Sequence, residues 1–184
     1  MPKLILIEGL RKYEGISEVD ALSNALQLMK KSCDGRRARH LKIIPHRAKN
    51  KKDFIRWLQK ETDFLHISAH GERENGITTL KITQRSKITP DQIKKLTINA
   101  RVVFVNACQQ AHDDMANAFL TAGKPKIQYY IAPKVDVPFD EAFIVALLFY
   151  KKAFIEKRKR LSYALKYVYK LKDIRTNYWY WESP

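Results

Sequence analysis

The chain has 184 residues, of which 45% are hydrophobic, so we expect one domain with one core over residues 1–184 and no second domain. Neither a secretory signal near the start nor a run of about 18 apolar residues that could span a bilayer is present, which predicts a cytoplasmic protein without membrane contact. The 35 Lys and Arg residues against 19 Asp and Glu residues give a net charge of +16, which favours an acidic partner.

The first third of the chain alternates strand and helix patterns. Lys3–Glu8 is almost entirely apolar, as in a strand buried on both faces of a parallel sheet. Ser17 opens a helix whose apolar residues recur at spacings of three and four. The other elements predicted in this part are a strand at Leu41–Ile44 that ends at Pro45, a helix at Lys51–Glu61 and a strand at Asp63–Ala69.

The alternation continues to the end of the chain. The further elements predicted are a small hairpin or edge strand at Ile77–Ile82, a helix beginning at Thr89-Pro90, a strand at Arg101–Ala107, a helix capped by Asp113 or Asp114 and stopped by Gly123, a strand at Lys126–Ala132, and a long helix at Phe139–Lys159 that Leu161, Leu165 and Val168 extend or follow. For the aromatic segment Tyr178–Trp181 we favour a last strand over an exposed contact for a partner. This order predicts an α/β fold, a three-layer sandwich with a mostly parallel central sheet flanked by helices.

Basic residues gather in two stretches. Lys30–Lys60 holds twelve Lys or Arg residues against two acids, and Lys151–Arg175 holds ten against two. Either stretch could bind nucleic acid or an acidic protein. The alternative, given equal weight, is a pair of solvated faces that keep the protein soluble.

The chain has two cysteines, Cys33 and Cys108, without a CxxC spacing. This pattern suggests neither a disulfide framework nor a zinc cage. Cys108 follows one predicted strand, and His70 follows another. If the two strands are neighbours, the loops beyond their carboxyl ends bring both side chains to one cleft.

A thiol reacts as its thiolate, and forming the thiolate at neutral pH needs a nearby base or the positive N-terminal end of a helix. His70 could act as the general base for Cys108, and the N-terminal end of the following helix could stabilise the thiolate. The backbone N–H groups of Gly71 and Cys108 could form an oxyanion hole. The alternative for Cys108 is a buried core residue, because a lone Cys at a strand end is more often core than catalyst.

The other candidates are assigned ordinary roles. His66 shares a strand face with Ser68 and His70 and is predicted to be a structural hydrogen-bonding residue. Cys33 is expected to be an unreactive thiol. The remaining histidines, His40, His46 and His112, are weaker candidates for a catalytic role than His70.

Two motifs resemble those of CHAT and other caspase-like cysteine peptidases. They are FLHISAHG at Phe64–Gly71, an apolar strand that ends in His-Gly, and VVFVNAC at Val102–Cys108, a strand that ends in Ala-Cys. Between them, KITPDQIKKL resembles the helical segment that separates these motifs in CHAT domains, and the similarity covers roughly Asp63 to Trp181.

The resemblance implies a caspase-like sandwich and a peptide hydrolase with His70 as catalytic histidine and Cys108 as nucleophile. It implies a protein or peptide substrate and a thioester acyl-enzyme formed without metal or cofactor. It also implies a regulatory or sensor protein acting in trans, as in bacterial antiviral defence systems. The alternative function is a catalytically silent caspase-like scaffold that binds an acidic protein or nucleic acid through its basic faces.

The sequence departs from the family pattern after the fifth predicted strand. Family members commonly have a Trp-Pro-Val-Asp-like stretch there, whereas this chain has Ala132-Pro133-Lys134-Val135-Asp136. Clan relatives often place an acidic residue in the S1 pocket to bind a basic P1 side chain, so Asp136 is the first candidate and Asp140 the second. The alternative for both is helix capping or a surface carboxylate.

Overall fold

The computed structural model describes residues 1–9, 17–32, 41–155, 161–170 and 178–183. The main sheet has six strands in the order β2-β1-β3-β7-β8-β9, and all neighbouring pairs are parallel except β8 with β9. The bounds of these strands are Lys42–Arg47 for β2, Lys3–Glu8 for β1, Thr62–Ser68 for β3, Ala100–Asn106 for β7, Tyr129–Pro133 for β8 and Tyr178–Glu182 for β9.

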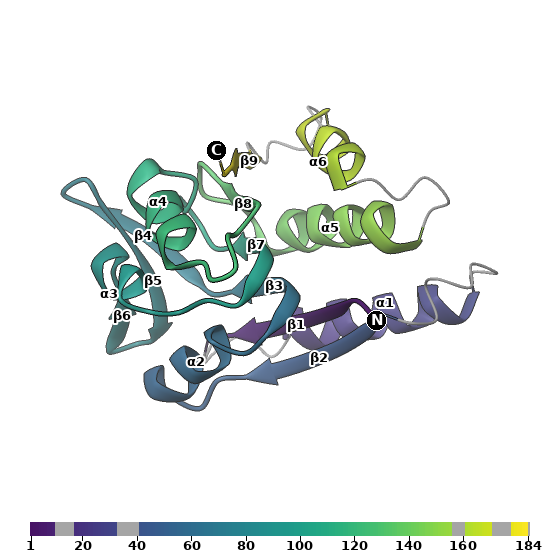
Figure 1. Ribbon diagram of the computed structural model, residues 1–184, viewed down its shortest axis with the longest axis horizontal. Coiled ribbons are helices and arrows are strands. Elements are labelled where there is room, and N and C mark those ends of the chain that lie inside the picture. The colour runs from purple at the N-terminus through teal and green to yellow at the C-terminus, as the bar shows by residue number, and fades with distance from the viewer. Residues whose placement is uncertain (10–16, 33–40, 156–160, 171–177, 184) are drawn as a thin grey trace.

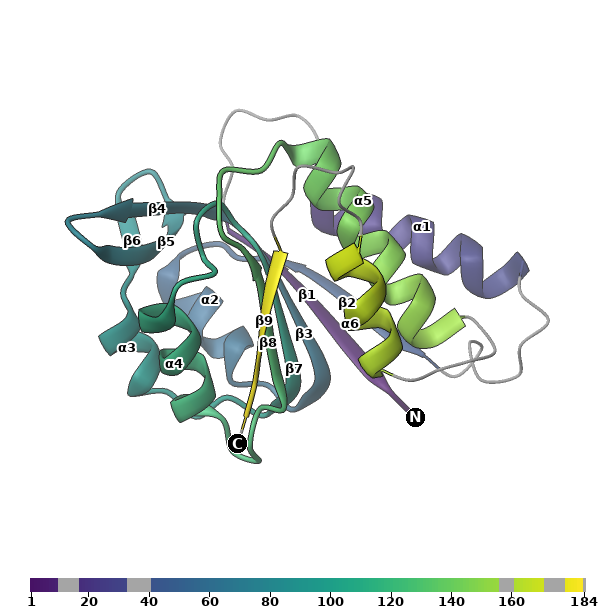
Figure 2. The same ribbon diagram turned by 90° about the horizontal axis from the view of Figure 1, so that it is seen from above.

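Helices cover both faces of this sheet, so the fold has three layers (Figures 1 and 2). The helices α1, α5 and α6 lie on one face, and α2, α3 and α4 lie on the other (Figure 2). In chain order the helical bounds are Glu18–Ser32 for α1, Lys51–Leu58 for α2, Pro90–Lys94 for α3, Asp113–Ala122 for α4, Phe139–Tyr150 for α5 and Leu161–Lys170 for α6. The predicted α/β sandwich with a mostly parallel sheet is confirmed.

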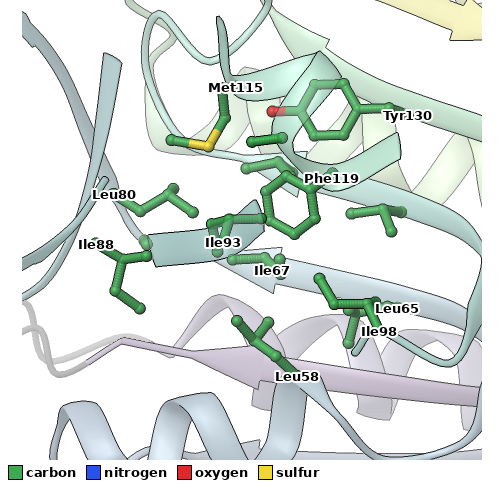
Figure 3. Packing of buried hydrophobic residues seen from close by; sticks show 14 of the residues in the cluster. Leu58, Leu65, Ile67, Leu80, Ile88, Ile93, Ile98, Met115, Phe119 and Tyr130 are labelled. Atoms are coloured by element: carbon green, nitrogen blue, oxygen red, sulfur yellow. The ribbon is translucent and has the colours of Figure 1, made fainter. Parts of the chain in front are cut away.

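The alternation of side chains along each strand divides the core into two clusters. Ile5 and Ile7 of β1 belong to the cluster under α2, α3 and α4, whereas Leu4 and Leu6 belong to the cluster under α1, α5 and α6. Figure 3 shows part of the first cluster, in which Phe119 of α4 lies among aliphatic side chains from the strands and helices around it. Both faces of β1 are buried, which is why its sequence is apolar throughout.

A small second sheet follows β3. It is antiparallel and consists of β4 (His70–Glu74), β5 (Ile77–Thr83) and β6 (Ser86–Ile88). Asn75 and Gly76 form the β4–β5 turn, both with positive φ, of 50° and 79°. The hairpin predicted around Ile77–Ile82 is therefore present, and it begins at His70.

Several predicted boundaries are wrong by a few residues. Strand β2 runs through Pro45 to Arg47. The sheet tolerates Pro45 because β2 is an edge strand, where the missing N–H of a proline need not break a hydrogen bond to a neighbouring strand. Helix α2 ends at Leu58, three residues before the predicted end. The N-cap of α4 is His112, and the Asp114 carboxylate instead accepts hydrogen bonds from Thr78 of β5.

The C-terminal part agrees with the prediction in outline. Helix α5 ends at Tyr150 and continues as a π-helical turn over Lys151–Ile155, and α6 follows as a separate helix. The last strand predicted at the aromatic tail is confirmed, since β9 pairs with β8 from Tyr178 to Glu182. The predicted inward residues Tyr150 and Phe154 are buried, whereas Phe143 and Leu147 are half-buried.

We expect Phe104→Ala to lower the free energy of unfolding by about 3–5 kcal/mol, because it removes a fully buried ring and leaves a cavity. The aromatic rings around it, with centroid distances of 5.1 to 5.9 Å, belong to His66, Phe149, Tyr150 and Tyr178. Urea denaturation would measure the change. Ile144→Ala, at a side chain 44% exposed, is the control and should change stability by about 0.5 kcal/mol or less. Equal losses from both variants would contradict this packing.

Candidate active site

The candidate site lies at the carboxyl edge of the main sheet, where β3 and β7 end side by side. Ser68 of β3 pairs with Asn106 of β7, and the Ala69 N–H donates to the Asn106 carbonyl at 3.1 Å. The predicted neighbourhood of the two strands is therefore confirmed. Two residues beyond these strand ends, His70 and Cys108 line one cavity of about 110 Å³.

Cys108 lies in a turn between β7 and α4. Its side chain is half-buried and free of any disulfide, and its Sγ is 3.9 Å from the Val137 carbonyl oxygen. Gln109 has a φ of 55°, which turns the chain sharply after Cys108. Helix α4 begins only at Asp113, so Cys108 is not in its first turn, and the predicted stabilisation of a thiolate by this helix end is wrong.

His70 does not end β3 but begins β4, and its side chain is exposed. The next residue, Gly71, packs directly on the turn that carries Cys108. A Cβ at Gly71 would lie 1.8 Å from the Cys108 carbonyl oxygen, far inside van der Waals contact. The glycine thus allows the backbone of β4 to touch the backbone of Cys108, and this contact holds the histidine-bearing strand beside the cysteine.

The inner end of the cavity carries a buried carboxylate that the sequence analysis did not single out. Glu18, the first residue of α1, is 1% exposed and lines the cavity. Its carboxylate accepts hydrogen bonds from Ser68 Oγ at 2.7 Å and from Asn106 Nδ2 at 2.5 Å. A third contact, at 3.1 Å, joins it to His66 Nε2.

These contacts keep Glu18 ionised. Burial alone would raise its pKa, but the hydrogen bond and charge of His66 and the hydrogen bonds from Ser68 and Asn106 outweigh burial and lower the pKa below its usual value. His66 Nδ1 lies 3.1 Å from the Tyr150 hydroxyl. Nε2–H donates to the Glu18 carboxylate, and Nδ1 is hydrogen-bonded to the Tyr150 hydroxyl. His66 is therefore the buried hydrogen-bonding residue that was predicted.

Tyr178 of β9 closes another side of the cavity. Its hydroxyl donates to Asn106 Oδ1 at 2.5 Å, and Asn106 Nδ2 also donates to the Ala142 carbonyl at 2.9 Å. Burial, together with the nearby carboxylates and Cys108, raises the pKa of Tyr178 well above its usual value, so the phenol stays protonated as a donor. The C-terminal strand thus contributes a wall of the candidate site.

The structure does not bring the two predicted S1 carboxylates to this cavity. Asp136 and Asp140 are both exposed, and the cavity is lined instead by Val137 and Phe139 from the same segment. Asp136 Oδ1 accepts a hydrogen bond from Gln109 Nε2 at 2.9 Å. Asp140 lies in the first turn of α5, where a carboxylate favours the helix dipole.

Glu18 could have been found from its position in the sequence. It begins the helix after β1, and every β-to-α connection of a parallel sheet starts at the same carboxyl edge as His70 and Cys108. The signal is weak, because acidic residues are common in the first turn of any helix. Tyr178 gave no such signal, since its place follows from the antiparallel pairing of β9 with β8.

His46 and His112 are not among the residues that line this cavity. His46 Nε2 is 2.9 Å from Asp53 Oδ2, and its ring stacks on Trp57. Burial and then the charge of Arg73 lower the pKa of His112. The predictions for His40 and Cys33 fall outside the described residues. Within the ranges that the structure describes, no group of three or more His, Cys, Asp or Glu residues could hold a metal ion.

The first basic stretch is described apart from residues 33–40, and its described part lies at the end of α1, on the edge strand β2 and on helix α2. Its exposed cations include Lys42, Arg47, Lys49, Lys52, Arg56 and Lys60. Some are engaged within the chain: Arg47 pairs with Asp20, and Arg56 is 2.6 Å from Asp53. The second stretch is only partly described. No helix in the described parts of the chain is long and apolar enough to cross a membrane.

No protein-family model matches this sequence, and no curated protein matches it. Among solved structures, the chain is similar to the crystal structure of the Drosophila initiator caspase Dronc, with a TM-score of 0.55 and 10% sequence identity. The match covers 98% of this chain and 78% of the Dronc chain. We conclude that the chain has a caspase-like fold.

We expect Gly71→Ala to destabilise the protein by about 1–3 kcal/mol, because the added Cβ must push β4 away from the Cys108 turn. Thermal unfolding would measure this loss. The control is Gly9→Ala, whose Cβ would meet its nearest atom, the Ile82 carbonyl oxygen, at 3.2 Å and so needs a much smaller shift. A Gly71→Ala protein as stable as the Gly9→Ala protein would show that β4 does not touch this turn.

Proposed function

We propose that this chain is a cysteine endopeptidase in which His70 is the general base and Cys108 the nucleophile. The observation that carries the proposal is that both side chains line one cavity at the carboxyl edge of a caspase-like sheet. The half-buried thiol lies at the wall of this cavity, and the exposed imidazole can exchange protons with solvent.

The proposed reaction proceeds in two steps. The His70 imidazole takes the thiol proton, and the Cys108 thiolate attacks the carbonyl carbon of the substrate. Backbone N–H groups, for which Gly71 and Cys108 are the candidates, stabilise the oxyanion. The imidazolium then protonates the leaving amine, which leaves a thioester on Cys108. Water, deprotonated by His70, hydrolyses this thioester and restores the thiol.

We also propose the CHAT type within the caspase-like peptidases. The support is the pair of motifs at Phe64–Gly71 and Val102–Cys108 and the helical segment between them, which is α3 in the structure. On this basis the enzyme acts in the cytoplasm, and a regulatory protein releases its activity, as in bacterial defence systems.

For the substrate, we propose a preference for Lys or Arg at P1. Glu18 places an ionised carboxylate at the inner end of the cavity. A charge-assisted hydrogen bond from an ammonium or guanidinium group to this carboxylate is stronger than a contact between neutral groups. A P1 Asp or Glu would meet a like charge in a partly dry site and be rejected.

The dyad predicts where a thiol-directed peptide probe reacts. The adduct, mapped by peptide mass spectrometry, should lie on Cys108, and His70→Ala should slow its formation by about 100-fold or more, because the base is lost. Cys33→Ser is the matched control and should label like the wild type. Labelling at Cys33 with Cys108 unmodified would refute the assignment.

The P1 preference predicts that Glu18→Gln lowers kcat/KM for a peptide with Arg at P1 by about 10-fold or more, because a buried charge partner is lost. A peptide library that differs only at P1 would measure it. Asp136→Asn and Asp140→Asn are the controls and should keep the preference, since both side chains are exposed and off the cavity lining. Loss of the preference in Asp136→Asn and its retention in a folded Glu18→Gln protein would move the pocket to Asp136.

A further inference from the structure

Gln110 connects the β4–β5 hairpin with the turn that carries Cys108. Its side chain is fully buried, and Nε2 donates one hydrogen bond to the Thr79 carbonyl and one to the Cys108 carbonyl, each at 3.0 Å. Thr79 belongs to β5, which pairs rung by rung with β4, so that Gly71 lies opposite Leu80. One carboxamide therefore bonds the backbone of the cysteine and the backbone of the hairpin that carries His70.

The same carboxamide takes part in the close contact at Gly71. A Cβ on Gly71 would lie 2.6 Å from Gln110 Nε2 as well as 1.8 Å from the Cys108 carbonyl oxygen. The other side of the turn is bonded to β8 and the segment after it: Gln109 N–H donates to the Val135 carbonyl at 3.2 Å, and the Tyr130 hydroxyl donates to the Gln110 carbonyl at 3.0 Å. The Cys108 turn is thus held between β8 and the hairpin.

The oxygen of the same carboxamide indicates that Gln110 is present for its two N–H donors. Gln110 Oε1 is buried and has no hydrogen-bond partner among the described residues. A buried oxygen without a hydrogen-bond partner lowers the stability of the folded protein. If Gln110 served only for packing, an apolar side chain would therefore be more stable at this position. The residues that line the cavity do not include Gln110, so it does not touch a substrate there.

From these contacts, and resting on the proposed function, we infer that Gln110 is a positioning residue. Its two N–H groups hold the Cys108 carbonyl at a fixed place relative to β5, and β5 holds β4. The position of the thiol relative to the His70 imidazole then depends on this bridge. Without it the turn keeps its bonds to β8, and Asp114 at the start of α4 still accepts from Thr78 of β5, but Cys108 itself loses its direct hydrogen-bonded link to the hairpin. The two reacting side chains then become misaligned.

The test uses Gln110→Met in the full chain, which keeps an unbranched side chain and removes both donors. We expect kcat for a peptide with Arg at P1 to fall about 10- to 100-fold with little change in KM, since misplacement by about 1 Å can cost this much. The rate at which iodoacetamide alkylates Cys108, followed from about pH 5 to about pH 9, should take on the pH profile of His70→Ala. Deuterium exchange should rise in the peptides covering residues 77–82 and 107–112.

Thr62→Val is the matched control. Thr62 is also buried, and its one hydroxyl hydrogen is shared between two backbone carbonyls, those of Lys3 at 2.8 Å and Phe64 at 3.0 Å from Oγ1, but it lies at the opposite end of β3. This variant should lose stability while keeping kcat and the alkylation profile of the wild type. Gln110→Asn, which keeps the carboxamide but is too short to reach both carbonyls, replaces Gln110→Met if the latter does not fold, and should change in the same direction.

Wild-type kcat, alkylation profile and exchange in a folded Gln110 variant would overturn the inference, and so would equal losses of kcat in Thr62→Val. Failure of the proposed function has a different signature. If the wild type hydrolyses no peptide, or alkylates with the profile of His70→Ala, the dyad is wrong, and the exchange rates at residues 77–82 and 107–112 still decide whether Gln110 holds the turn to the hairpin.

Discussion

The candidate site depends on one buried charge. A carboxylate with 1% exposure is tolerated in a protein interior only when hydrogen-bond donors surround it, and Glu18 receives donors from two neighbouring strands, β3 and β7. Asn106, one of these donors, also accepts from Tyr178 of β9 and donates to the backbone of α5. His66 extends the network to Tyr150 at the end of α5. A single charge thereby links the start of α1, the centre of the sheet, α5 and the C-terminal strand, and it forms the inner end of the cavity.

The end of the cavity that carries His70 and Cys108 is organised by backbone contact instead of charge. Gly71 lets β4 touch the Cys108 turn, and Gln110 fills the remaining space with two donors to backbone carbonyls. Since β4 continues directly from β3, this contact holds the hairpin at the carboxyl edge of the sheet. The two ends of the cavity therefore rest on different interactions, and a change at the Glu18 end leaves the contacts of the Cys108 turn in place.

The likeness to Dronc at 10% identity is a likeness of fold. A parallel sheet covered on both faces requires apolar strands and helices with one apolar face, and many sequences satisfy that requirement. The residues of the cavity are few, and they lie in connections whose length and direction the fold sets. Function in such a protein is argued from these few side chains and their geometry, because the fold alone is shared by proteins with different roles.

The sequence by itself determined the order of the main strands and helices, the burial of β1, the presence of a histidine and a cysteine just beyond the ends of two strands, and the structural role of His66. These features follow from local periodicity and from the rule that the carboxyl ends of parallel strands meet at one edge. Only the tertiary structure decided that Glu18 and Tyr178 line the cavity while Asp136 and Asp140 do not, and that α4 begins five residues after Cys108. The reason is that cavity walls come from segments far apart in the chain, such as α1 and β9, and no local pattern records which of their side chains the packing turns inward.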